Sequence, residues 1–86
     1  MNKVVSKFEY VRPQKFNGSD YIVVCISAND PAILEIQIER MVDWCTTNFG
    51  GVGDLWSGYQ ARWYNNGDTF WFHYEEDFAL FALRWG

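Results

Sequence analysis

The sequence predicts a small α+β domain in which two strands, a helix, two more strands and a second helix follow one another. Three observations predict this order. An Asn-Gly pair separates two aromatic runs, an Asp-Pro pair opens an amphipathic segment, and a β-branched run precedes that segment. Because the chain has 86 residues, of which 49% are apolar, we expect a single domain over residues 1–86 with a thin core.

The first two strands are predicted from alternation and from β-branched residues. Residues 3–12 alternate between apolar and polar side chains, and Pro13 is expected to end this strand because proline lacks a backbone donor. Residues 14–20 are predicted to form a loop. Residues 21–27 are apolar on both faces, which is typical of a central strand, and we expect them to pair with the first strand.

A long amphipathic helix is predicted over residues 31–48. Asp30 can cap the free backbone N–H groups, Pro31 suits the first helical position, and Gly50 is a typical C-terminal residue. Trp44 lies on the flank of the apolar stripe, where it is either an ordinary surface hydrophobe or the shoulder of a binding surface. The stripe itself, expected to face the core, consists of Leu34, Ile38, Met41, Val42, Cys45 and Phe49.

Residues 59–74 are predicted to form a β-hairpin with a type I′ turn centred on Asn66 and Gly67. This register places Arg62 opposite Trp71. Side chains alternate across a strand, so each strand contributes to two faces. The apolar face, predicted to be core, carries Tyr59, Ala61, Trp63, Phe70, Phe72 and Tyr74. The mixed face, predicted to meet water or a partner, carries Gln60, Arg62, Tyr64, Thr69, Trp71 and His73.

A short second helix is predicted over residues 75–82, because three acids lead it and Arg84 comes late, as the helix dipole favours. Residues 83–85 are alternatively a short final strand. From residue 21 onward the order is then β-α-β-β-α-(β), which is that of a ferredoxin-like split βαβ unit with an extra N-terminal strand. Both helices of that fold lie on one face of the sheet, so we expect the mixed face of the hairpin to be open.

Catalytic and cofactor-binding classes find little support in the sequence. Residues 50–54 are glycine-rich but lead from a helix into a strand, the reverse of a phosphate loop. His73, the only histidine, lacks the spacing of a metal site, and no serine or cysteine lies in a nucleophile elbow. Cys25 and Cys45 lie in apolar segments and are predicted to be buried free thiols. We therefore expect neither enzyme activity nor a cofactor.

The net charge of −4 argues against a protein that binds nucleic acid through its phosphates. No apolar run is long enough for a signal peptide or a membrane span, so we expect a cytoplasmic protein with no membrane partner. The closing run from Phe78 to Gly86, which follows an aromatic strand, resembles the ends of small accessory proteins of tailed bacteriophages. That resemblance implies an inhibitor of host transcription or of a defence system such as a CRISPR effector, and it assigns no functional residue.

The predicted function is a non-catalytic protein-binding module whose partner is a host protein. An aromatic content of 20% motivates this prediction, because aromatic side chains are enriched at interfaces. Two alternatives remain: a single-stranded nucleic-acid-binding protein that stacks bases on the aromatic face, and a self-associating structural protein, most simply a homodimer. The residues predicted to bind the partner are Gln60, Arg62, Tyr64, Trp71 and His73, with Trp44 beside them.

Overall fold

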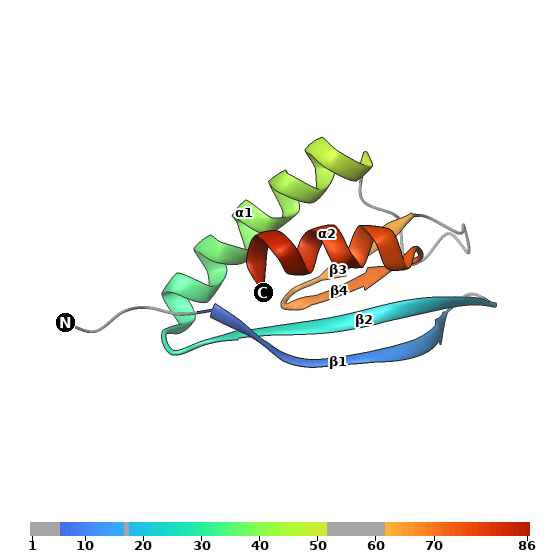
Figure 1. The fold of residues 1–86 in the computed structure, drawn as a ribbon. Coiled ribbons are helices and arrows are strands. Elements are labelled where there is room, and N and C mark those ends of the chain that lie inside the picture. Colours follow the sequence, from blue (N-terminus) through green and yellow to red (C-terminus); the bar gives the residue numbers. More distant parts are fainter. Residues whose placement is uncertain (1–5, 17, 52–61) are drawn as a thin grey trace.

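The computed structural model describes residues 6–16, 18–51 and 62–86, which form a four-stranded antiparallel sheet and two helices (Figure 1). The strand order is β1-β2-β4-β3, so β1 and β3 are the edges. Both helices lie on the same face of the sheet (Figure 1). The predicted α+β class is therefore confirmed. The elements are β1 (Ser6–Phe16), β2 (Ser19–Ala28), α1 (Pro31–Phe49), β3 (Trp63–Asn66), β4 (Thr69–Phe72) and α2 (Glu75–Trp85).

Strand β1 is longer than the sequence predicts. The prediction that Pro13 ends the strand is wrong, since Pro13 lies within β1 opposite Ile22 of β2. Proline is tolerated there because β1 is an edge strand, where an outward-facing N–H needs no neighbouring strand. The register of β1 also shifts between Phe8 and Tyr10, as in a β-bulge. The predicted loop shrinks to the short connection between Phe16 and Ser19.

The β3–β4 hairpin forms, but its turn lies one residue further along than predicted. Gly67 and Asp68 are the central residues, and Gly67 has a φ of 59°. Each strand residue therefore faces a partner two positions away from the predicted one. Because side chains alternate with a period of two, those of β3 and β4 keep their predicted faces. The observed pairs are Trp63–Phe72, Tyr64–Trp71, Asn65–Phe70 and Asn66–Thr69.

The main core lies between the helices and the sheet. Phe81 of α2 is its centre, with ring centroids 5.1 Å from Phe70 and 4.9 Å from Phe72. Aromatic side chains bury a large area each, which suits a core of so few residues. The predicted stripe of α1 is confirmed, and Cys25 and Cys45 are buried and free. The core cluster consists of Val24, Ile26, Met41, Cys45, Phe49, Trp63, Phe70, Phe72 and Phe81.

The helix ends follow local chemistry. The carboxylate of Asp30 accepts a hydrogen bond of 2.9 Å from the Ala32 backbone, and Gly50 follows α1 with a φ of 92°. The alternative of a final strand at residues 83–85 is wrong, because α2 continues to Trp85, which packs against the core. No helix in the described part of the chain is long and apolar enough to span a bilayer.

Candidate functional site

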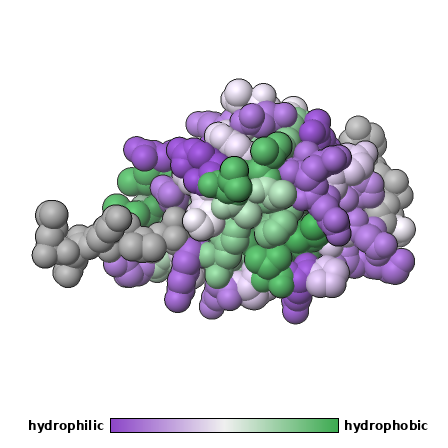
Figure 2. Space-filling view, in the orientation of Figure 1, coloured by the Kyte–Doolittle hydropathy of each residue, from purple (hydrophilic) through white to green (hydrophobic). Residues whose placement is uncertain are grey.

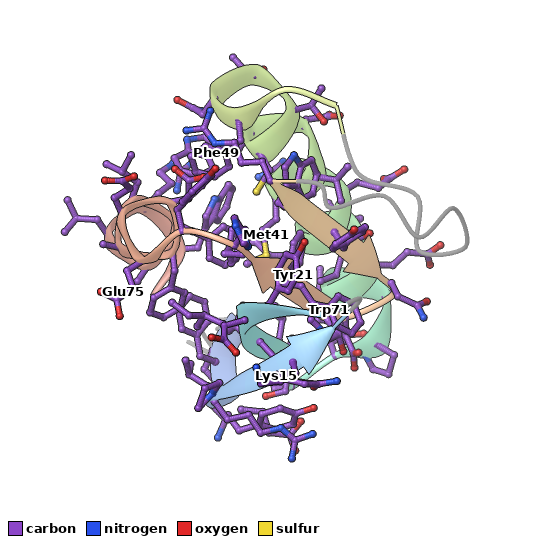
Figure 3. All side chains as sticks on the ribbon, turned by 90° about the vertical axis from the view of Figure 1, so that its right-hand side faces the viewer. Lys15, Tyr21, Met41, Phe49, Trp71 and Glu75 are labelled. Carbon is purple, nitrogen blue, oxygen red and sulfur yellow. The ribbon has the colours of Figure 1, made fainter. Side chains whose placement is uncertain are left out.

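The outer face of the sheet, opposite the helices, is more closed than predicted. Tyr64 is 0% exposed, so the prediction that it lies open is wrong. Its ring centroid lies 5.4 Å from that of Tyr21, and the half-buried Trp71 packs against the same pair (Figure 3). Burial and the neighbouring Tyr64 raise the pKa of Tyr21. The outer face thus has a small aromatic core of its own, defined by Tyr21, Tyr64 and Trp71.

Arg62 points to the helices rather than to the outer face. The predicted pairing with Trp71 is wrong, because Trp71 lies opposite Tyr64. The Arg62 guanidinium donates two hydrogen bonds to Asp77 of α2, of 2.6 and 2.9 Å, and lies 5.2 Å from the ring centroid of Phe49. The Asp77 side chain is 1% exposed, so Arg62 neutralises a buried carboxylate. This contact joins the end of α1, the start of β3 and the first turn of α2.

The other residues of the predicted patch are also dispersed. His73 is half-buried, with its ring centroid 5.1 Å from that of Tyr21, and its buried Nδ1 has no hydrogen-bond partner. Trp44 lies on the helix side, where its ring meets Phe49 edge-on at 5.4 Å. Gln60 lies outside the described residues. The predicted residues therefore do not form one contiguous surface, and their binding of a partner stays a prediction.

An apolar groove lies between β1 and α2, where the sequence predicted no site. Val11, Pro13, Ile22 and Phe78 line it, and its volume is about 450 Å³. On α2, Leu80 is 53% exposed and Leu83 is 87% exposed. In Figure 2, hydrophobic side chains form a green band across the face of the molecule on which α2 lies over the sheet. We call these six residues the apolar band.

The apolar band follows from where the sheet ends. Helix α2 places Phe81 over β4, and on the edge strand β1 it packs on Phe8, whose ring stacks on that of Phe81 at 5.6 Å. The register sets Val11 opposite Val24, whose side chain belongs to the helix-facing core. Val11 therefore lies on the helix side of β1, yet it is 44% exposed. The sequence prediction missed this surface because the bulge between Phe8 and Tyr10 reverses the alternation that was predicted for Val11, and because the predicted strand ended before Pro13.

The exposed edge of β1 is poorly suited to adding another strand. It carries Lys7 and Lys15, the bulge near Tyr10, and Pro13, all features that protect sheet edges from pairing with another chain. A partner that meets this side of the molecule would therefore contact side chains of the apolar band rather than the backbone of β1.

In residues 6–16, 18–51 and 62–86, no group of three or more His, Cys, Asp or Glu side chains is placed to hold a metal ion. No family model, no curated protein and no solved structure matches the chain. The surfaces of the molecule are therefore the remaining guide to its function.

Proposed function

We propose that this chain is a small, non-catalytic protein-binding module that docks through the apolar band. The observation that carries this proposal is the pair of exposed leucines on α2, of which Leu83 is 87% exposed, on the same helix that contributes Phe78 to an apolar groove. Single exposed hydrophobes are ordinary, but a contiguous apolar surface of this kind is typical of interaction sites. Burial of one leucine side chain by a partner contributes about 1.5–3 kcal/mol.

The scaffold proposed for this surface is a ferredoxin-like split βαβ unit. Three observations support it: β2, α1, β3, β4 and α2 follow one another in the required order, β4 separates β2 from β3, and both helices lie on one face. A ferredoxin-like fold has a final strand at one edge of its sheet, and in this proposal β1 occupies that edge position instead. A rigid sheet behind the apolar band lowers the entropic cost of binding, because few side chains need to be ordered.

The partner in this proposal is a protein. An apolar surface on a chain with a net charge of −4 suits a protein surface better than a phosphate backbone. The resemblance of residues 78–86 to phage accessory proteins extends the proposal to a host protein, inhibited or redirected in the host cytoplasm. A second copy of the chain is the competing partner, because one apolar surface can pair with itself about a two-fold axis.

The decisive experiment introduces a charge into the apolar band. Leu83→Glu is expected to weaken partner capture from a host lysate by at least about tenfold, because it buries a carboxylate without a counter-charge. Tyr10→Glu is the matched control, since Tyr10 is 40% exposed on β1 beyond the bulge and lies outside the band. Tagged proteins are compared by affinity capture and mass spectrometry, with circular dichroism to verify folding.

Three outcomes separate the candidates. Loss of the same captured protein from Leu83→Glu, but not from Tyr10→Glu, supports docking through the apolar band. Equal capture by both variants and by the wild-type protein would contradict it. Light scattering distinguishes self-association, because a wild-type dimer that becomes a monomer in Leu83→Glu identifies a second copy as the partner.

A further inference from the structure

A second groove lies on the opposite side of the helix layer, between α1 and the edge strand β3. Two cavities, of about 540 and about 270 Å³, adjoin at Ile38 and Glu39, which line both, and together they make a hollow along α1. One cavity reaches Asn65 of β3, and the other reaches Gly67 and Asp68 in the β3–β4 turn. We call this hollow the acidic groove.

The floor of the acidic groove is apolar. Leu34, Ile38 and Val42 recur at four-residue steps along α1, and each is half-buried against the main core. Their other sides are uncovered because the sheet ends at β3, so this side of α1 extends beyond the last strand. Ile36, which is 47% exposed, adds an apolar side chain to the rim.

The rim of the acidic groove is strongly negative. Glu35, Glu39, Asp43 and Asp68 line it, whereas Arg40 is its only cation among the described residues. None of these four carboxylates forms an ion pair with a described residue, because the described ion pairs are Lys15–Asp20 and Arg62–Asp77. The acidic groove therefore offers an apolar floor together with uncompensated negative charge.

We propose that the acidic groove binds a basic amphipathic segment of a partner protein. Apolar side chains of the segment would cover Leu34, Ile38 and Val42, while its lysines or arginines would reach the four carboxylates. Long basic side chains suit both tasks, since their stems cover apolar surface and their heads stay at the rim. A neutral or acidic segment would desolvate the carboxylates without a counter-charge, and an anionic membrane would be repelled.

This inference goes beyond docking through the apolar band, because the two surfaces lie on different sides of the helix layer and share no residue. Charge also separates them. The groove within the apolar band is lined by one cation and one carboxylate, Arg12 and Glu75, and so carries no net charge. The acidic groove selects its partner by sign of charge as well as by apolar contact, so the two proposals can fail independently.

The test uses a fluorescently labelled leucine–lysine amphipathic peptide of about 14 residues, which as a helix spans about 21 Å. Anisotropy titrations are expected to show binding to the wild-type protein that weakens as NaCl rises from about 50 to about 300 mM, because salt screens exposed charges. A peptide with glutamate in place of lysine is expected not to bind. Equal binding of both peptides, or no binding of the lysine peptide, would overturn the proposal.

Paired variants locate the binding site. Glu35→Gln with Glu39→Gln is expected to weaken binding of the lysine peptide by about tenfold, as removal of two exposed ion pairs allows. Glu75→Gln with Glu76→Gln removes the same charge from α2 and is expected to change affinity by less than about twofold. Equal weakening by both pairs would show that only net charge matters, and would overturn the proposal.

Two single variants complete the test. Ile36→Ser is expected to weaken binding of the lysine peptide without loss of folding, because Ile36 is already half exposed. Leu83→Glu, which disables the apolar band, is expected to leave peptide binding intact. Loss of peptide binding in Leu83→Glu but not in Ile36→Ser would assign the peptide to the apolar band and refute the acidic groove.

Discussion

The β3–β4 turn allows backbone strain to be measured separately from steric fit. Gly67 has a φ of 59°, in the left-handed region, and a Cβ built at this position meets no atom within 4 Å. Any cost of a larger residue at this position is therefore a cost of backbone conformation. That region costs an L-residue about 1–2 kcal/mol, and up to about 3 kcal/mol for a strained β-branched residue. Replacing glycine also lowers the conformational entropy of the unfolded chain, which offsets this cost by about 0.4–1 kcal/mol. Gly67→Val is thus expected to lower the free energy of unfolding by about 1–2 kcal/mol.

The neighbouring Asn66 tests the register of the same turn. It lies in β3 opposite Thr69, where a β-branched residue is favourable, so Asn66→Val is expected to change stability by less than about 0.5 kcal/mol. In the type I′ turn predicted from sequence, Asn66 would instead have a positive φ, and valine would be as costly there as at Gly67.

Urea denaturation followed by tryptophan fluorescence measures both changes. Gly67→Asn is the control, because asparagine tolerates the left-handed region better than valine does. Equal destabilisation by Asn66→Val and Gly67→Val would refute the observed register. A Gly67→Val variant as stable as Gly67→Asn would refute the left-handed turn.

Two further predictions concern the core. Trp63→Ala is expected to lower the free energy of unfolding by about 3–5 kcal/mol because Trp63 is fully buried, whereas Trp71→Ala, at a half-buried position, is expected to cost about 1–2 kcal/mol. Equal losses in urea titrations would mean that the outer face is as well packed as the main core. The free energy of unfolding is also expected to fall between about pH 9 and about pH 12. Burial raises the pKa of the Cys45 thiol to about 12 in the folded protein, so in this range the thiol loses its proton in the unfolded chain but keeps it in the folded protein. Urea titrations at increasing pH check this trend, and a slope unchanged in Cys45→Ala would contradict the assignment to Cys45.

Features that depend on local chemistry or on simple periodicity could be predicted from the amino-acid sequence. The bounds of α1 could be predicted because Asp30 caps its start, Gly50 follows its end, and its apolar residues recur at helical steps. The faces of β3 and β4 could be predicted even though the turn was misplaced by one residue. That error moved each cross-strand partner by two positions, and a period of two leaves the faces unchanged.

Which surfaces are open depends on contacts between distant parts of the chain, and no sequence pattern revealed it. Pro13 is compatible with a strand only if that strand lies at an edge, and the strand order is set by contacts between distant segments. The burial of Tyr64 against Tyr21 and the bonds from Arg62 to Asp77 likewise join residues far apart in the chain. The apolar band and the acidic groove exist because the sheet extends past α2 on one side and ends short of the outer side of α1 on the other. No local pattern encodes where a sheet stops relative to its helices, because that limit depends on the packing of the whole fold.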